Sequence, residues 1–381
     1  MKYCNWVLFW SLLGSLVSTP VQAQESAAAT NVILVTLDGV RWQEVFHGLD
    51  QQLAADKEFN TLGDALVKQF GAETPALSAA KLFPFLHEVI AKQGTLIGNR
   101  AAQSCARVTN PWFFSYPGYN EILTGVVDPA INTNEAKPNP NVSFLEWLNK
   151  DVASFKGKVL AFGSWDAFPA ILNSARSGIP VEVGQNGNSA EAATLKRLAA
   201  DLPVLWASMR YDAFTHHGAL KALREDKPRA LYVAYGETDD FAHDGRYEQH
   251  LLAANRTDRF LRELWETVQS DPQYRDNTVL FITTDHGRGN APIETWQHHA
   301  SKESLAGYMK SLAAYKEGIV GSDAVWMAAI GAGVPARGPV ATASCVGSNQ
   351  IAGTLLQLLG LESKQFNAKA GAPMTEFLSG K

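Results

Sequence analysis

The sequence is poor in cysteine and carries no excess of positive charge. It has three cysteines among 381 residues, and 33 Lys and Arg stand against 38 Asp and Glu, for a formal net charge of −5. A surface with this balance does not attract nucleic acid or an anionic membrane, so we expect neither as a partner. Internal repeats are also absent, as are low-complexity tracts beyond the short run QESAAAT. The composition is that of an ordinary globular protein.

The apolar run at the N-terminus is too short for a comfortable membrane span. Lys2 supplies a positive charge, Trp6 to Val17 form an apolar stretch, and Val21-Gln-Ala23 is a small-x-Ala cleavage signal. We therefore predict that residues 1–23 are a secretory signal peptide cut after Ala23. We expect a secreted, periplasmic protein without a stable membrane anchor; an uncleaved anchor helix is the alternative.

Cleavage would leave two cysteines, Cys105 and Cys345, in the mature chain. They could pair in an oxidising compartment, but the sequence does not show whether they lie close enough. Residues 24–381 are enough to bury a large core, and no linker divides them. We predict a single catalytic domain, and it stays open whether residues 165–230 form a lid and whether the protein oligomerises.

Apolar runs and helical patterns alternate along the chain. The runs are rich in β-branched residues and are typical of buried strands, at 31–37, 158–164, 230–236, 278–284 and 324–331. Helical patterns lie among them, at 82–94, 189–202, 247–269 and 348–360. This alternation predicts an α/β fold, a three-layer α/β/α sandwich with a mostly parallel central sheet.

Acids and histidines follow three of these runs directly. In sheets of this kind the site lies beyond the carboxyl ends of the strands, so these side chains should gather at one edge. The candidates are Asp38 in DGV, Asp239 and His243 in GETDDFAH, Asp285 and His286 in DHG, and then His298 and His299 in QHHA.

Carboxylates mixed with imidazoles suit zinc, and less specifically manganese or iron. The candidates are too many for one tetrahedral zinc but enough for two divalent ions that share a bridging ligand. Paired metals of this kind clamp the attacking and leaving oxygens of an in-line displacement.

Such a site needs a nucleophile, and Ser115 in TNPWFFSYPGYNEILTG precedes a Pro-Gly turn and a short helix. The amide groups and positive dipole end of a helix N-terminus favour an anionic ester. A serine hydroxyl bound to a metal would ionise near neutral pH. Ser115 is therefore our candidate catalytic residue.

Four segments resemble, in order, the metal and nucleophile segments of the alkaline phosphatase superfamily: VILVTLDGVRWQEVF, FFSYPGYNEILTG, GETDDFAHDG and ITTDHGRG. They are most similar to its nucleotide pyrophosphatase/phosphodiesterase and phosphatase branches. The segment SNQIAGTLLQLLGLE also resembles the C-terminal helix of the family. The resemblance implies an alkaline-phosphatase-like fold.

The resemblance further implies two metal sites. One would use Asp38, Asp285, His286 and Ser115, and the other Asp239, His243 and a late histidine. We choose His299 because WQHHA resembles a Trp-x-x-His-Gly pattern of bacterial relatives, and His298 is the alternative.

The chain departs from the family in its phosphate contacts. Gly118 stands where the phosphodiesterase branch has an asparagine, so we name Asn120 and Arg107 as candidate substrate-binding residues, with Asn110 and Arg288 as alternatives. A formylglycine sulfatase would need an arginine where this chain has Tyr119.

The function implied is a secreted two-metal hydrolase of small phosphate esters, monoester or diester, acting through a phosphoseryl intermediate. A sulfatase or phosphonate hydrolase of the same superfamily is the alternative enzyme. A non-catalytic, metal-stabilised binding protein is the alternative of another class.

Overall fold

The computed structural model describes residues 1–2, 28–184 and 190–379, with the backbone alone for residues 190–192. The predicted cleavage site after Ala23, with nearly all of the predicted signal peptide, lies outside the described residues. Within them, no helix combines the length and the apolarity that crossing a membrane requires.

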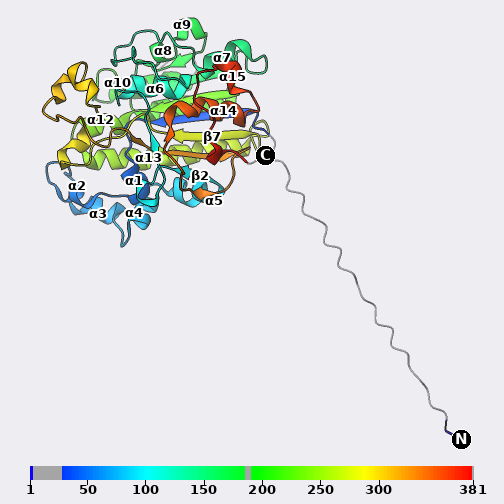
Figure 1. Cartoon of the computed structure of the whole chain (residues 1–381), viewed down its shortest axis with the longest axis horizontal. Helices are drawn as coiled ribbons and strands as arrows, with labels where there is room; N and C mark the ends of the chain where they lie inside the picture. Colours follow the sequence, from blue (N-terminus) through cyan, green and yellow to red (C-terminus); the bar gives the residue numbers. More distant parts are fainter. Residues whose placement is uncertain (3–27, 185–189, 380–381) are drawn as a thin grey trace.

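The central sheet holds eight of the described strands, in the order β10-β2-β9-β7-β1-β6-β4-β5 (Figure 1). Of these, β9 alone runs antiparallel to its neighbours. The strands are β1 (Asn31–Leu37), β2 (Gly94–Ile97), β4 (Val159–Gly163), β5 (Val181–Glu182), β6 (Ala230–Tyr235), β7 (Thr278–Thr283), β9 (Met327–Gly331) and β10 (Gly338–Pro339).

The predicted strand at 324–331 is divided in the structure. Its first part, β8 (Ala324–Val325), joins β3 (Ala106–Arg107) and β11 (Val346–Gly347) in a separate three-stranded sheet. Trp326 lies at the division, where its indole Nε1 donates to the carbonyl of Val40 at 3.0 Å. An apolar run alone does not show that a strand changes sheets part way along.

The helices cover both faces of the central sheet. The long predicted helix at 247–269 is α13 (Tyr247–Ser270), whereas the one at 82–94 is interrupted near Pro84, which cannot continue an α-helix. The other helices of at least six residues are α1 (Trp42–His47), α3 (Asp64–Phe70), α4 (Pro75–Leu82), α6 (Ser115–Thr124), α7 (Phe144–Asp151), α10 (Ala190–Asp201), α11 (Asp212–Glu225), α12 (Glu237–His243) and α14 (Ile351–Leu358).

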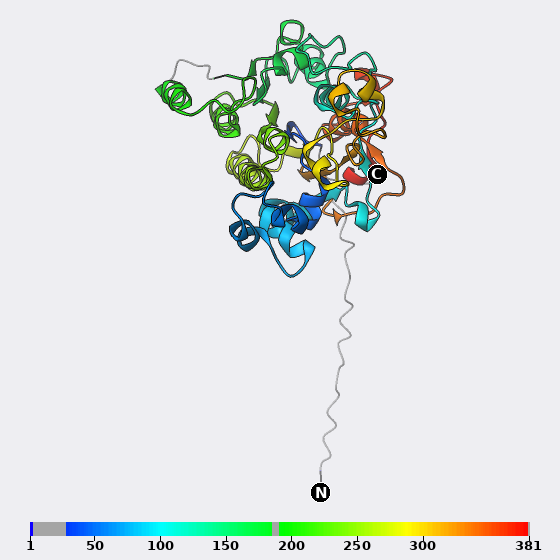
Figure 2. The same ribbon diagram turned by 90° about the vertical axis from the view of Figure 1, so that its left-hand side faces the viewer.

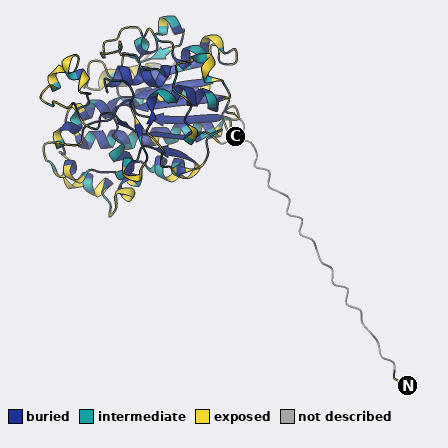
Figure 3. Ribbon diagram, viewed as in Figure 1, coloured by how far each residue is buried: buried dark blue, intermediate teal, exposed yellow. Residues whose placement is uncertain are grey.

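Side chains alternate across the strands and form two cores, one on each face. Figure 3 shows the central strands coloured as buried. In β1, Ile33 and Val35 pack with α1, α4, α11 and α13, whereas Val32 and Leu34 pack with α6, α7 and α14. The predicted three-layer sandwich with a mostly parallel sheet is therefore confirmed.

Cys105 and Cys345 form a disulfide, with 4.5 Å between their Cα atoms. Each directly precedes a strand of the small sheet, β3 and β11, which pair in parallel. The carbonyl of Cys105 also accepts a hydrogen bond from the amide of Val346 at 2.9 Å. The disulfide thus ties together two segments 240 residues apart.

Candidate active site

Three neighbouring parallel strands, β7, β1 and β6, end at one edge of the sheet, and the predicted site residues follow them. Asp38 follows β1, the pair Asp285 and His286 follows β7, and Asp239 and His243 lie on α12, which begins two residues after β6. Figure 2 looks toward the side of the molecule on which α12 lies in Figure 1. The structure therefore brings together residues almost 250 positions apart in the sequence.

Two overlapping groups of side chains could hold a divalent metal ion. One is Asp239, His243 and His299, and the other is Asp38, Asp239 and His286; within each group the ligand atoms lie within 4.8 Å of one another. Asp239 belongs to both groups, as a bridging carboxylate would. His286 Nε2 lies 3.2 Å from Asp38 Oδ1, and His243 Nε2 lies 3.2 Å from Asp239 Oδ2.

The structure distinguishes the two adjacent histidines. His299 is buried, and its Nε2 lies 3.0 Å from that of His243. The ring of His298 is more exposed, and its centroid lies 6.4 Å from the His243 ring. His299 is therefore the better placed of the two, and its role as a ligand stays a prediction.

Buried carboxylate oxygens at the site lack hydrogen-bond partners. Asp38 Oδ1 and Asp285 Oδ2 have no such partner among the described residues. Burial, with the charge of Asp239, raises the pKa of Asp38, and burial, with the charge of Asp38, raises the pKa of Asp285 well above its usual value. Both oxygens lie near one ring nitrogen, His286 Nε2, at 3.2 Å and 3.5 Å. One imidazole cannot offset several buried carboxylates, and a divalent cation would do so, so the residues present fit such an ion.

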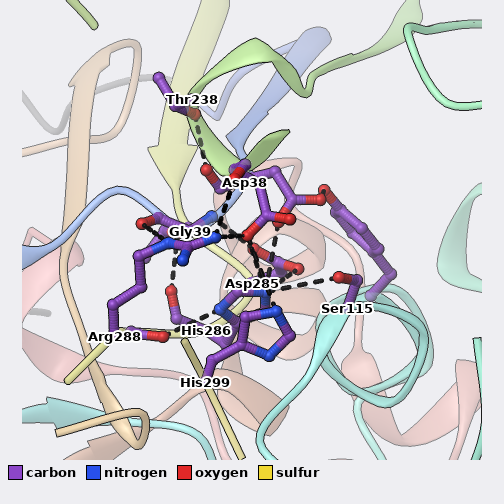
Figure 4. A network of polar contacts seen from close by, with 12 residues as sticks. Asp38, Gly39, Ser115, Thr238, Asp285, His286, Arg288 and His299 are labelled. Carbon is purple, nitrogen blue, oxygen red and sulfur yellow. Dashed lines mark hydrogen bonds and ion pairs between the residues drawn. The ribbon is translucent and has the colours of Figure 1, made fainter. Parts of the chain in front are cut away.

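Arg288 is fully buried and contacts three segments of the site, those that carry Gly39, Asp239 and Gln297 (Figure 4). Its guanidinium pairs with the Asp239 carboxylate and donates to the carbonyl of Gly39 at 3.1 Å and that of Gln297 at 2.7 Å. Burial alone would raise the pKa of Asp239, but Arg288 and His243 hold it well below its usual range. With these contacts, Arg288 is a positioning residue, and the alternative that it binds substrate has no contact to support it.

Replacing Arg288 with lysine should lower the free energy of unfolding by about 2–4 kcal/mol, because an ammonium group cannot keep the planar set of buried hydrogen bonds. Urea denaturation measures this change. Arg337→Lys is the matched control: Arg337 donates to three carbonyls, of Thr375, Glu376 and Leu378, but it is exposed. Equal effects of the two substitutions would contradict the assigned role of Arg288.

Ser115 begins helix α6 and points toward the same group of acids and histidines (Figure 4). Its Oγ lies 3.4 Å from His286 Nε2. Phe113, two residues earlier, has a positive φ of 56°, which is a strained conformation for an aromatic residue. The Asn110 side chain holds this turn by accepting from the amides of Trp112 and Phe113. The serine is thus held in place by a braced turn.

Two neighbours of Ser115 on α6 contact the ligand residues. The Tyr119 hydroxyl donates to Asp38 Oδ2 at 2.8 Å. Sequence analysis missed this contact, although the i, i+4 spacing places Tyr119 on the same helix face as Ser115. Close packing accounts for glycine at position 118, because a Cβ there would lie 2.4 Å from the carbonyl oxygen of Asp285. An asparagine cannot occupy this position in the present packing.

The candidate substrate-binding residues do not line the cavity beside Ser115. Asn120 is buried; its amide donates to the carbonyl of Val126, and its oxygen accepts from Asn139 and Asn141. Arg107 is exposed in the small sheet. A substrate contact by either residue stays a prediction without a structural contact to support it.

The cavity beside Ser115 has a volume of about 660 Å³. Trp165, Ser208 and Met209 contribute to its lining, and all three lie within the predicted lid region 165–230. Asn134 lines it too, and its side-chain oxygen accepts from the amide of Tyr116 at 2.9 Å. Whether the region moves stays a prediction.

A buried acid outside the site holds helix α12 in place. Asp212 accepts from the amide of Gly236 at 2.8 Å and from that of Glu237 at 3.1 Å. Its own amide donates to Glu237 Oε1 at 2.8 Å. Because Asp239 and His243 lie on the same short helix, this cap from α11 sets their position.

A match to a family model covers part of this site. Residues 205–303 match the Metalloenzyme superfamily, and the matched segment includes Asp239, His243, Asp285, His286 and His299. No curated protein matches the chain significantly in sequence.

Several solved structures share the fold. Wild-type alkaline phosphatase PafA has a TM-score of 0.53 at 11% identity, over 93% of this chain and 99% of that one. The lipoteichoic acid synthase LtaP from Listeria monocytogenes has a TM-score of 0.54 at 13% identity, over 89% and 74% of the two chains. A 2-O GAG sulfatase has a TM-score of 0.53 at 13% identity, over 91% and 73%. At these identities the likeness establishes the fold.

Proposed function

Because this chain has the fold of the alkaline phosphatase superfamily and its residues 205–303 match the Metalloenzyme superfamily, we propose that it is a secreted two-metal hydrolase of small phosphate esters. The observation that carries the proposal is that Ser115 Oγ lies 3.4 Å from His286, a member of one of two ligand groups that share Asp239. The predicted signal peptide supports secretion into the periplasm.

Two divalent ions, with zinc our first choice because of the imidazole ligands, would supply positive charge for the developing transition state and favour ionisation of the Ser115 hydroxyl. Manganese or iron would serve the same purpose. Asp38, Asp285, His286 and Ser115 would hold one ion, and Asp239, His243 and His299 the other.

Ser115 Oγ would attack phosphorus, and the bond from phosphorus to the ester oxygen would break as the alcohol leaves. Water would then cleave the phosphoseryl ester, which releases phosphate or a phosphate monoester and restores Ser115. Tyr119 would keep Asp38 oriented, and the braced turn at Phe113 would keep the serine aimed at the site.

A sulfatase or phosphonate hydrolase is the second candidate, since a 2-O GAG sulfatase is among the structures with this fold. Against a formylglycine sulfatase, the position of the required arginine is Tyr119, whose hydroxyl is used by Asp38. The third candidate, a metal-stabilised binding protein, predicts ion binding without turnover.

A turnover panel tests the proposal. The mature protein would be assayed with nitrophenyl phosphate, bis-nitrophenyl phosphate, a nitrophenyl alkylphosphonate and nitrophenyl sulfate, each with zinc or manganese. We expect metal-dependent release of nitrophenol from a phosphate ester that exceeds release from the sulfate. Release from the sulfate alone would reject the phosphate assignment, and ion binding without turnover would favour the binding protein.

A further inference from the structure

The cavity beside Ser115 is lined by acids and aromatic rings, and no Lys or Arg is among its described lining residues. Asp166 and Asp240 lie in this lining in addition to the candidate ligands Asp38 and Asp239. Asp240 Oδ2 has no hydrogen-bond partner among the described residues. The inference drawn from this lining rests on the proposed function, because it concerns the substrate of that same site.

The described lining of the cavity offers no lysine or arginine for the second negative charge of a monoester. The carboxylates of Asp38, Asp239 and Asp285, together with ionised Ser115, would already balance the charge of two divalent ions. Arg288 adds one positive charge but is paired with Asp239, and Asp166 lies in the lining without an ion pair among the described residues. A phosphate diester carries one negative charge fewer than a monoester, and a cationic substituent would pair with Asp166.

One wall of the cavity is built to present Trp165 and Asp166. Trp165 pairs with Met209 in an isolated antiparallel β-bridge, and the amide of Asp166 donates to the carbonyl of Ser208 at 2.9 Å. Met209 packs directly over Gly236, where a Cβ would lie 2.5 Å from the methionine sulfur. This wall is therefore anchored immediately before α12, the helix that carries Asp239 and His243.

The Trp165 indole is half-buried and packs edge to face against Phe168, with 6.2 Å between ring centroids. Asp166 is exposed to the cavity, and its carboxylate forms no ion pair with any described residue. Tyr308, which also lines the cavity, is 45% exposed, and its ring centroid lies 5.3 Å from that of Phe114, the residue before Ser115. Aromatic rings and a free carboxylate in the lining of one cavity are a combination that attracts an ammonium group.

We propose that the substrate is a phosphodiester in which one alcohol carries a quaternary ammonium group. Trp165 would contact the cation through its ring face and Asp166 through its charge, while the phosphate lies against Ser115. Trp165 and Asp166 would set specificity without taking part in bond breaking.

Two esters of equal shape test the proposal: nitrophenyl phosphocholine and nitrophenyl 3,3-dimethylbutyl phosphate, in which carbon replaces the charged nitrogen. We expect the wild-type enzyme to prefer the cationic ester in kcat/KM by roughly tenfold. Asp166→Asn and Trp165→Leu should each reduce this preference to about threefold or less. Asp151→Asn, at the exposed end of α7, is the control and should leave the preference unchanged.

The preference is the ratio of two kcat/KM values measured on one enzyme. A smaller folded fraction in a variant lowers both values equally and leaves the ratio unchanged. Ser115-dependent turnover of both esters at equal rates would overturn the ammonium specificity while leaving the hydrolase proposal intact. A preference that survives both substitutions would also overturn it. Absence of metal-dependent turnover of either ester, and of every ester of the panel, would reject the hydrolase proposal and the specificity together.

Discussion

Ser115→Ala is expected to lower kcat for the preferred phosphate ester by at least about a thousandfold, because the variant lacks the hydroxyl that would form the covalent intermediate next to His286. Metal content should stay above half of the wild-type value, since the acids and histidines remain. The measurement is initial-rate kinetics with fixed zinc or manganese. Acid-quenched wild-type enzyme should yield a phosphorylated peptide containing Ser115 in mass spectrometry.

Ser143→Ala is the matched control for this substitution. Ser143 also stands at the start of a helix, α7, where its Oγ accepts from the amide of Glu146 at 3.0 Å. Its loss should cost about 1 kcal/mol of stability without changing kcat, because the cap lies outside the site. Full activity of the Ser115 variant, or a phosphorylated peptide from another segment, would rule out Ser115 as the nucleophile.

Asp239→Asn is expected to abolish most of the stabilisation by metal, because Asp239 is the one residue common to both ligand groups in the described chain. If the free metal ion is kept at about 100 to 1,000 times its dissociation constant for the wild-type protein, ion binding should add about 3–4 kcal/mol to the free energy of unfolding. Removing the ions with a chelator should then lower the wild-type Tm by roughly 5–15 °C. Calorimetry with and without chelator, together with the measured number of bound ions, tests this.

The comparison uses the Tm difference within each variant, because Asp239 also pairs with buried Arg288 and its loss lowers stability without any metal. Asp244→Asn is the control: Asp244 lies next to α12 and accepts from Trp206 Nε1, an interaction that asparagine can keep. It should retain the wild-type Tm difference. An Asp239 variant with an unchanged Tm difference and ion content would contradict the shared ligand role.

Local sequence patterns were sufficient to predict the main strands and the edge of the sheet at which the acids gather. The run 31–37 ends at Leu37 in the structure as it does in the sequence, and Asp38 follows it directly. This worked because a strand buried on both faces must be apolar throughout, so its end is marked by the first charge. Since parallel strands share one carboxyl edge, the meeting of Asp38, Asp239 and Asp285 followed from the same pattern.

Sequence alone determined the residue types that can perform chemistry: the three acids that follow strands, the late histidines and Ser115. Tertiary structure decided which of them meet and what surrounds them. In the structure His299 rather than His298 contacts His243, and Arg288 is buried with hydrogen bonds to several segments of the site. The Asn120 side chain is hydrogen-bonded to the 139–141 loop. Local patterns report how a residue relates to its own strand or helix, whereas a cavity is formed by segments distant in sequence. Trp165, Asp166 and Tyr308 became part of the site only when the packing of those segments brought them beside Ser115.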